Sequence, residues 1–330
     1  MTNNRLQARQ NTKALRWSLL AVLSLTFFEL IAGSSLPVNT QLDDGKVAEA
    51  AESCEATTAD NTDWDKQSGI SQVSAPQAEQ ITSGSFDTII AILDTGIDQT
   101  HEDLAGKVVA EVNLTHSPTA ADVHGHGTHI AGIIASSGDS TFGIAGVAPN
   151  CRLMNVKVAD DSGACFSSVV ARGITWAVEH GANIINMSLV IDSPSPQLQQ
   201  AINYAWSRGV VVVAAAGNDM GTRLAYPAYY SNCIAVAAAD ADGHVASWSG
   251  NGAWVDVAAP GVKVYSILPD NGYGYKSGTS MAAAHVSGVA GLLFTTVSDD
   301  NGNGFVNDEV RAAIENSCDE LDTIALAKDA

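Results

Sequence analysis

The chain of 330 residues carries 16 lysines and arginines against 36 aspartates and glutamates, a formal net charge of −20. So acidic a surface repels phosphate backbones and anionic lipids, which argues against nucleic acid and membrane surfaces as partners. The length and the hydrophobic content of 46% allow a large core, and the 29 glycines favour a tightly packed α/β protein.

The first 35 residues have the composition of a secretory signal peptide. Four basic residues precede the apolar run 17–28, and Ala32, Gly33 and Ser34 offer a cleavage site. The run is short for a transmembrane helix, so an uncleaved anchor is the weaker alternative. Residues 36–59 are polar and acidic, which is typical of a disordered leader or short pro-segment. We therefore expect an exported monomer, free of the membrane after signal removal, whose folded domain covers residues 60–330.

The five cysteines are widely scattered and show no metal-ligand spacing. Export permits disulfides. If Cys54 is lost with the leader, four cysteines remain, and they allow three pairings among which the sequence does not choose. These four are Cys151, Cys165, Cys233 and Cys318.

A continuous apolar run at residues 87–93 predicts a strand buried on both faces. Asp94 follows it, at the kind of sheet edge where catalytic groups gather, although a turn-forming aspartate before glycine is the plainer alternative. The segment 124–132, His-Gly-His-Gly-Thr-His-Ile-Ala-Gly, then opens a helix of small residues. Its spacing does not match a zinc site. We interpret it as one imidazole held at the start of a helix.

Strands and helices alternate through the middle of the chain. The pattern predicts strands at 152–158, 183–187, 210–215 and 233–238, with helices at 166–180 and 196–208. Strands that alternate with helices of this length form βαβ units and a mainly parallel sheet. The expected fold class is therefore α/β, with helices flanking a central sheet.

Ser280 stands at the mouth of a long helix of small and apolar residues, which we expect to be buried on every side. Gly288 and Gly291 would let neighbouring elements approach the backbone of this helix closely. The unpaired N–H groups at a helix start favour developing negative charge, as nucleophilic acyl transfer requires. Taken alone, Ser280 is more readily interpreted as an ordinary N-cap, because N-cap serines far outnumber catalytic ones.

Asp94, His126 and Ser280 follow one another in the order of subtilisin, which differs from the order in chymotrypsin and the α/β-hydrolases. The segments 94–98 (Asp-Thr-Gly-Ile-Asp), 126–132 and 278–282 (Gly-Thr-Ser-Met-Ala) closely resemble the three signatures of subtilisin-like serine proteases. The resemblance covers residues 60–319 and is strongest to the thermitase-like branch. It implies a subtilisin-like three-layer fold with a mainly parallel central sheet.

The resemblance also assigns roles. Ser280 would attack the scissile carbonyl, His126 would carry the proton, and Asp94 would orient the imidazole. Asn218 resembles the side-chain donor of the oxyanion hole, its alternative being a turn residue after glycine. The other histidines are expected to pack or to form local hydrogen bonds.

By the same resemblance, an extended protein or peptide substrate would pair with the main chain on two sides. A second group of residues would form a wall of the pocket for the side chain before the cut. The expected substrate-binding residues are Asp161, Ser162 and Gly163 on one side, Ser188, Leu189 and Val190 on the other, and Ala215, Ala216 and Gly217 in the wall.

Several departures from the family bear on function. Val190 and Ile191 stand where relatives have two glycines, and only one of them is expected to face the pocket and oppose a bulky aromatic side chain. The alternative is that both turn away. Ala284 replaces the usual proline and restores a helix N–H. The segment before the domain is shorter than the family's folded prodomain, and the family's final glycine-rich turn and helix are missing.

Structural calcium is the one cofactor that the resemblance implies. Oxygen ligands at the proposed strong site would come from Asp60, Asp103, Gly138, Ser140, Phe142 and Ile144. A second candidate is the loop 299–309, where Asp299, Asn301 and Asn303 match the opening of an EF-hand loop while the glutamate falls one position early. A glycine-rich hinge is an equally good interpretation of that loop.

Together these features predict an exported, calcium-stabilised serine endopeptidase. A catalytically idle binding or scaffold protein of the same fold is the main alternative, favoured by the missing prodomain and opposed by the complete set of catalytic residues. An esterase of the α/β-hydrolase type is disfavoured by the residue order and by Gly-Thr-Ser-Met in place of its nucleophile motif.

Overall fold

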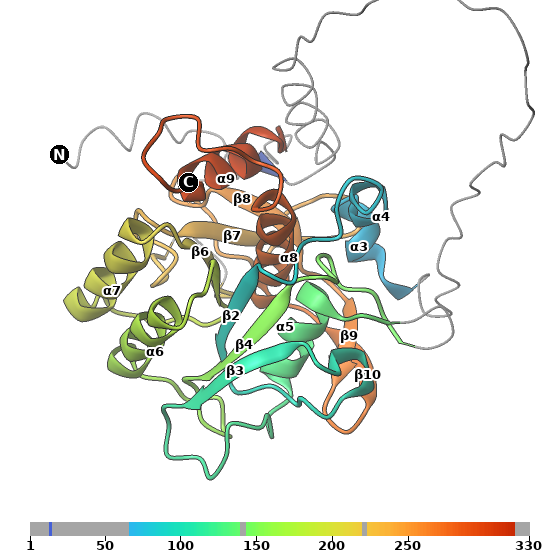
Figure 1. Ribbon diagram of the computed structural model, residues 1–330, viewed down its shortest axis with the longest axis vertical. Helices are drawn as coiled ribbons and strands as arrows, with labels where there is room; N and C mark the ends of the chain where they lie inside the picture. The colour runs from blue at the N-terminus through green and yellow to red at the C-terminus, as the bar shows by residue number, and fades with distance from the viewer. Residues whose placement is uncertain (1–12, 15–65, 139–142, 220–222, 321–330) are drawn as a thin grey trace, which may run out of the picture.

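The computed structural model describes residues 13–14, 66–138, 143–219 and 223–320. Its centre is a parallel sheet of seven strands in the order β8-β7-β6-β5-β2-β4-β3, with helices on both faces (Figure 1). The short strands β1 (Lys13–Ala14) and β11 (Asp319–Glu320) extend the β8 edge, β11 running antiparallel. The predicted three-layer α/β fold is confirmed.

The interior strands are nearly continuous apolar runs because both of their faces are covered. All residues of β5, β6, β7 and β8 are buried, and β2 has one half-buried residue at its start. The sheet strands in chain order are β2 (Ile89–Asp94), β3 (Val108–Asn113), β4 (Arg152–Lys157), β5 (Ile184–Met187), β6 (Val211–Ala215), β7 (Ile234–Ala239) and β8 (Val257–Pro260).

The sheet separates two apolar cores. Helices α6 (Ser167–Glu179) and α7 (Pro196–Ser207) pack on one face. Helices α5 (His126–Ala135), α8 (Thr279–Leu293) and α9 (Asn307–Asn316) pack on the other, together with α3 (Ser68–Gln72) and α4 (Ala75–Ala78). Because the seven strands run parallel, their carboxyl ends all lie at one edge of the sheet, where ligands bind in folds of this kind.

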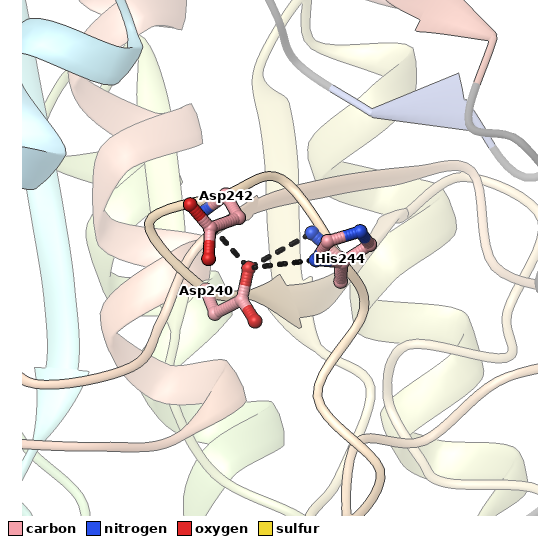
Figure 2. A group of neighbouring side chains, drawn as sticks. All are labelled: Asp240, Asp242 and His244. Carbon is pink, nitrogen blue, oxygen red and sulfur yellow. Dashed lines mark hydrogen bonds and ion pairs between the residues drawn. The ribbon is translucent and has the colours of Figure 1, made fainter.

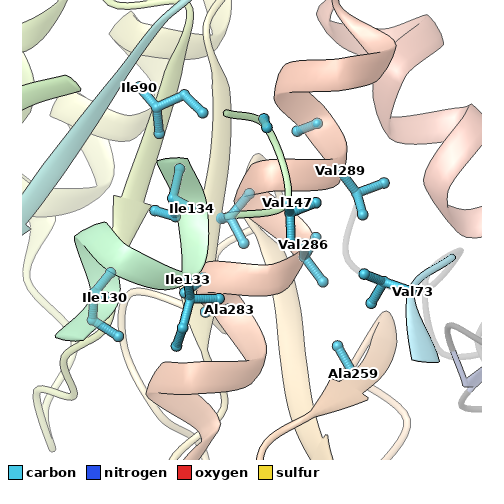
Figure 3. Packing of buried hydrophobic residues seen from close by; sticks show 14 of the residues in the cluster. Val73, Ile90, Ile130, Ile133, Ile134, Val147, Ala259, Ala283, Val286 and Val289 are labelled. Carbon is cyan, nitrogen blue, oxygen red and sulfur yellow. The ribbon is translucent and has the colours of Figure 1, made fainter. Parts of the chain in front are cut away.

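Helix α8 runs through the larger core, and all fifteen of its residues are buried, as predicted. Figure 3 shows Ala283 of α8 beside Ile133 of α5, and Val289 on the other side of α8, toward Val73. A Cβ on Gly288 would lie 2.5 Å from that of Val147, so glycine is required for this close approach. This close contact holds α8 in a fixed position within the core.

The sequence did not predict the edge strand β3 or the hairpin of β9 (Val264–Leu268) and β10 (Gly272–Lys276). Burial alternates along the first part of β3, and β10 is largely half-exposed, so neither forms an apolar run. The hairpin turns at Asp270 and Asn271, both with positive φ, as a type I′ turn requires. In the described residues Cys151, Cys165 and Cys233 are thiols, so they form none of the permitted disulfides.

Candidate active site

The end of β2 and the start of α5 bring Asp94 and His126 together. Oδ1 of Asp94 lies 2.7 Å from Nδ1 of His126, and the carboxylate is buried. Gly127 makes this possible, because a Cβ there would lie 2.1 Å from the carbonyl oxygen of Gly96. The small residues of the motif therefore set how closely the helix approaches the strand.

Asp122, which the sequence reasoning missed, caps the start of α5. Its buried carboxylate accepts hydrogen bonds from the N–H of Gly125 (2.8 Å) and from both the N–H (2.8 Å) and the hydroxyl (2.7 Å) of Thr128. It also accepts one from the Thr95 hydroxyl (2.9 Å), which in turn accepts the Gly127 N–H (3.0 Å). An aspartate just before a helix signals a cap. The bonds to Thr95 and Gly127 are tertiary contacts.

The environment of His126 favours its protonated form. Burial alone would lower its pKa, but the charge and the hydrogen bond of Asp94 outweigh burial and raise the pKa above its ordinary value. Asp122 adds to this rise, while Lys276 opposes it. The side chain can therefore take up a proton and hold it beside a carboxylate.

Ser280 is the second residue of α8, and it is 9% exposed. Its hydroxyl donates to the carbonyl oxygen of Ser188 (3.1 Å), and the Ser188 hydroxyl donates to the carbonyl oxygen of Ser280 (2.9 Å). Ser188 follows the end of β5. The nucleophile candidate is thus tied to a residue predicted to bind substrate.

Asn218 lies beside the same helix start. Its side-chain oxygen accepts hydrogen bonds from the N–H (2.9 Å) and the hydroxyl (3.0 Å) of Thr279, and that hydroxyl accepts the Gly217 N–H (3.0 Å). Because its oxygen is engaged, the amide must offer its N–H groups elsewhere. Thr279, which the sequence reasoning did not single out, therefore fixes which way the amide of Asn218 points.

A small cavity lies between the ends of β5 and β6. It has a volume of about 20 Å³ and is lined by Val190, Ala216 and Gly217 among others. A Cβ on Gly217 would lie 3.7 Å from a methyl of Val190, so these two residues face each other across the cavity. Ile191 instead exchanges backbone hydrogen bonds with Tyr226 (2.7 and 3.1 Å). Val190 is thus the β-branched residue that narrows the cavity.

The remaining predicted substrate-binding residues are divided among three positions. Asp161 pairs with Lys157 (2.9 Å), and a Cβ on Gly163 would lie 3.2 Å from the His124 ring, which places this loop beside the start of α5. Ala215 is buried at the end of β6, and Leu189 packs against the smaller core. Ser162 donates to Asp160 (2.6 Å) within its own turn.

A larger open cavity of about 710 Å³ lies between α6 and α7, lined by Trp176 and Tyr204 among others. None of the predicted catalytic residues lines it. Size alone therefore does not locate the chemistry in this fold.

Two of the other histidines, His129 and His285, are buried and have structural roles. Burial lowers the pKa of His129 to about 3 and that of His285 to about 4, so both are neutral near pH 7. His129 bonds to the Gly274 carbonyl (3.2 Å), and His285 donates to the Met281 carbonyl (2.8 Å). Both pack within the core, as expected.

Asp103 is the described residue of the predicted strong calcium site that carries a carboxylate. It is buried, burial raises its pKa, and one of its oxygens accepts the Ile144 N–H (2.9 Å). The backbone of Gly143 lies against it, since a Cβ there would be 2.1 Å from Oδ1. No lysine or arginine in the described part of the chain pairs with this carboxylate. Asp60, Ser140 and Phe142 lie outside the described residues, while Gly138 is bonded to the carbonyl of Ile144 (2.9 Å).

The loop 299–309 is closed by its own hydrogen bonds. The Asp299 carboxylate accepts the N–H groups of Gly302, Asn303 and Gly304 (2.8–3.1 Å). The amide of Asn301 donates to both Asp308 and Glu309 (2.7 Å each). The loop thus gathers the oxygens of an EF-hand opening, yet these bonds equally suit a hinge before α9.

Asp240, Asp242 and His244 form a third group of possible metal ligands, on the turn after β7 (Figure 2). Asp240 accepts the N–H groups of Asp242 (3.0 Å) and His244 (2.9 Å), and its carboxylate lies 3.7 Å from the His244 ring nitrogen. The group is largely exposed. Its bonds are those of an aspartate that closes a turn.

The subtilase family model matches residues 86–328, a span that contains all the side chains of the candidate active site. The chain belongs to the subtilase family. It is 47% identical to thermitase from Thermoactinomyces vulgaris, over 78% of this chain and 89% of thermitase. It is 44% identical to the thermophilic serine proteinase of Bacillus sp. strain AK1, over 74% of this chain and 59% of that protein. An alkaline elastase from Bacillus sp. strain YaB is 42% identical, over 76% and 64% of the two chains.

The subtilase is therefore a serine endopeptidase, whose substrates are proteins, and its similarity to the thermitase-like branch is confirmed. Within the described residues, no helix of this subtilase has the length and apolar composition needed to cross a membrane.

Proposed function

We propose that the subtilase cleaves peptide bonds through an acyl-enzyme formed on Ser280. In the free enzyme the Ser280 hydroxyl rests on the Ser188 carbonyl, and for catalysis it transfers its hydrogen bond to Nε2 of His126. His126 takes the proton as Oγ attacks, then delivers it to the leaving amine. Asp94 holds the imidazole by Nδ1 and stabilises the imidazolium.

The oxyanion of the tetrahedral intermediate would receive two donors. One is the amide of Asn218, whose oxygen is held by Thr279, and the other is the N–H of Ser280 at the start of α8. The Asp94–His126 bond is the observation that carries the proposal, because a buried carboxylate 2.7 Å from an imidazole is what a general base requires. The same pair opposes the alternative of an idle scaffold.

Labelling by a fluorophosphonate, together with hydrolysis of denatured casein, tests this proposal. The wild-type protein should be labelled and active, and Ser280→Ala should lose both properties. The losses in Ser280→Ala, His126→Ala and the double variant should be similar, because the residues act as a unit. Wild-type turnover by a folded Ser280→Ala protein would exclude the mechanism.

The narrow cavity supports a preference for small side chains before the cut. A volume of about 20 Å³ holds one or two water molecules, so Val190 would oppose the ring of phenylalanine or tyrosine and admit alanine. The substrate main chain would pair with the backbone at Ser188–Val190 and at Asp161–Gly163.

Calcium would bind beside Asp103 and stabilise the native chain. The buried carboxylate without a lysine or arginine partner in the described residues fits a cation, and main-chain carbonyl oxygens, such as those of Gly138 and Ile144, are ligands that calcium takes. Asp103, Gly138 and Ile144 would contribute, with Asp60, Ser140 and Phe142 as further candidates. Calcium at Asp299, Asn301 and Asn303 is a second, separate proposal. The metal takes no part in the reaction.

Export is supported by the composition of residues 1–35, and the acidic surface suits an extracellular monomer that acts on proteins. The family match over residues 86–328 supports a peptidase domain within the part of the chain from residue 60 onward.

A further inference from the structure

Lys157, at the end of β4, is a fully buried lysine next to the candidate active site. It stands in register with Asp94 on the neighbouring strand. A buried ammonium is costly unless every proton is bonded, so its partners must be held firmly. Here all three partners belong to loops that the proposed mechanism uses.

The first partner is the carbonyl oxygen of Thr95, the residue after Asp94. The second is the carbonyl oxygen of Ala121 (3.2 Å), the residue before the carboxylate that caps α5. The third is the carboxylate of Asp161 (2.9 Å) in the predicted substrate-binding loop. The ammonium of Lys157 therefore links three loops: the one that follows Asp94, the one that precedes His126, and the one that would bind substrate.

We propose that Lys157 is a positioning residue, which fixes the substrate-binding segment 161–163 relative to Asp94 and His126. The inference rests on the proposed function, because it assumes that an extended substrate pairs with this loop. Asp161 then serves the site through its ion pair and does not contact the substrate by its own side chain. The ammonium sets the distance between the bound main chain and the acid–base pair.

Substrates of two lengths test this role. A tetrapeptide amide reaches the loop, whereas an ester of a single blocked amino acid does not. For Asp161→Asn, which keeps the shape and breaks the ion pair, kcat/KM for the tetrapeptide should fall about tenfold further than kcat/KM for the ester. Lys157→Met should show a larger split, and Lys157→Arg should partly restore it. All rates are divided by the concentration of sites titrated with fluorophosphonate, which removes the effect of misfolded protein.

The matched control is Asp160→Asn. Asp160 is one residue away, and its substitution removes the same charge. Its carboxylate accepts hydrogen bonds from Ser162 and Ala164 within its own turn, and an asparagine side chain can accept the same bonds. Its ratio between the two substrates should equal that of the wild type. A ratio in Asp161→Asn within twofold of the wild-type ratio would overturn the inference and make Lys157 merely structural. Failure of fluorophosphonate to label the wild-type protein would instead refute the proposed function.

Discussion

The first turns of α5 and α8 each carry a predicted catalytic side chain, yet the two helix starts differ in how their N–H groups are hydrogen-bonded. At α5, the Asp122 carboxylate and the Thr95 hydroxyl accept the N–H groups of Gly125, Gly127 and Thr128. At α8 the N-cap is Gly278, which has no side chain to accept a hydrogen bond, and Asn218 accepts the N–H and the hydroxyl of Thr279. Side chains therefore accept more N–H groups at the helix start of the proposed base than at that of the proposed nucleophile.

Electrostatics explains the difference. Burial lowers the pKa of His126, and Asp94 and Asp122 raise it. The positive end of a helix also disfavours an imidazolium, so carboxylates suit this position. The same positive end favours an oxyanion, so the nucleophile requires donors that are left open. Two helix starts of one fold are thus prepared for opposite charges.

Asp94→Asn should have the largest effect, because it removes the charge that offsets burial and the helix end at His126. We expect a loss of about 10⁴-fold in kcat, with the wrong tautomer favoured. Active-site-titrated kinetics with a peptide amide would measure it. Asp270→Asn, at an exposed carboxylate in the β9–β10 turn, is the control and should keep full activity. A loss below tenfold in Asp94→Asn would mean that the carboxylate does not orient the base.

Asn218→Ala tests the open end at α8. Removing this donor should lower kcat by about 10²–10³-fold, a range established on subtilisin itself, while KM changes little. Stopped-flow or steady-state kinetics would separate the two constants. A change confined to KM would show that Asn218 binds the ground state and does not serve the oxyanion.

Val190→Gly sharpens the comparison on the substrate side of α8. Opening the cavity should raise kcat/KM for phenylalanine before the cut relative to alanine by a few tens of times, since a methylene-scale mismatch is worth about 1–3 kcal/mol. A peptide library that varies only this position would show it, with Ile191→Gly as the comparison variant. Equal preference for the two residues in the wild type, unchanged in Val190→Gly, would contradict the proposal.

Asp122→Asn tests the closed end at α5. It removes one cause of the raised pKa of His126, so the acid limb of kcat/KM, which should lie above pH 6.5 in the wild type, should move to lower pH. The raised pKa of His126 also affects stability. It stabilises the folded state at low pH, where His126 is protonated, and this contribution is lost as pH rises through the folded pKa. Loss of charged hydrogen bonds should also cost about 1.5–3 kcal/mol of unfolding free energy. An unmoved acid limb would show that Asp122 is only a cap.

Removal of calcium by a chelator should have the smallest effect on the reaction rate. It should act on stability, through the proposed site at Asp103, which lies near the segment that follows α5. EGTA should lower Tm, because calcium binds the native chain and not the unfolded one. Asp103→Ala should remove most of that response, and Asp299→Ala should remove a further part only if the loop 299–309 also binds calcium. No change of Tm with chelator would eliminate both sites.

Much of this subtilase follows from its sequence. The apolar runs of β2, β5 and β6 predicted buried parallel strands because both faces of such strands must be covered. The uncharged run of small and apolar residues after Ser280 predicted a buried helix, because such a segment must be covered on every side. The three motifs predicted the side chains that we propose as catalytic, since their residue types and order suit the chemistry.

Only the tertiary structure decided how these side chains are held. Thr95 and Lys157 bond to partners far along the chain, so no local pattern marks them, whereas Asp122 has only the local signal of a helix cap. The role of Thr279 depends on its hydrogen bonds to Asn218. The strand alternation predicted that one of Val190 and Ile191 faces the pocket. In the structure Ile191 pairs its backbone with Tyr226, whereas Val190 lines the small cavity that we propose as that pocket. Periodicity sets which residues share a face, whereas long-range hydrogen bonds set which face meets the substrate.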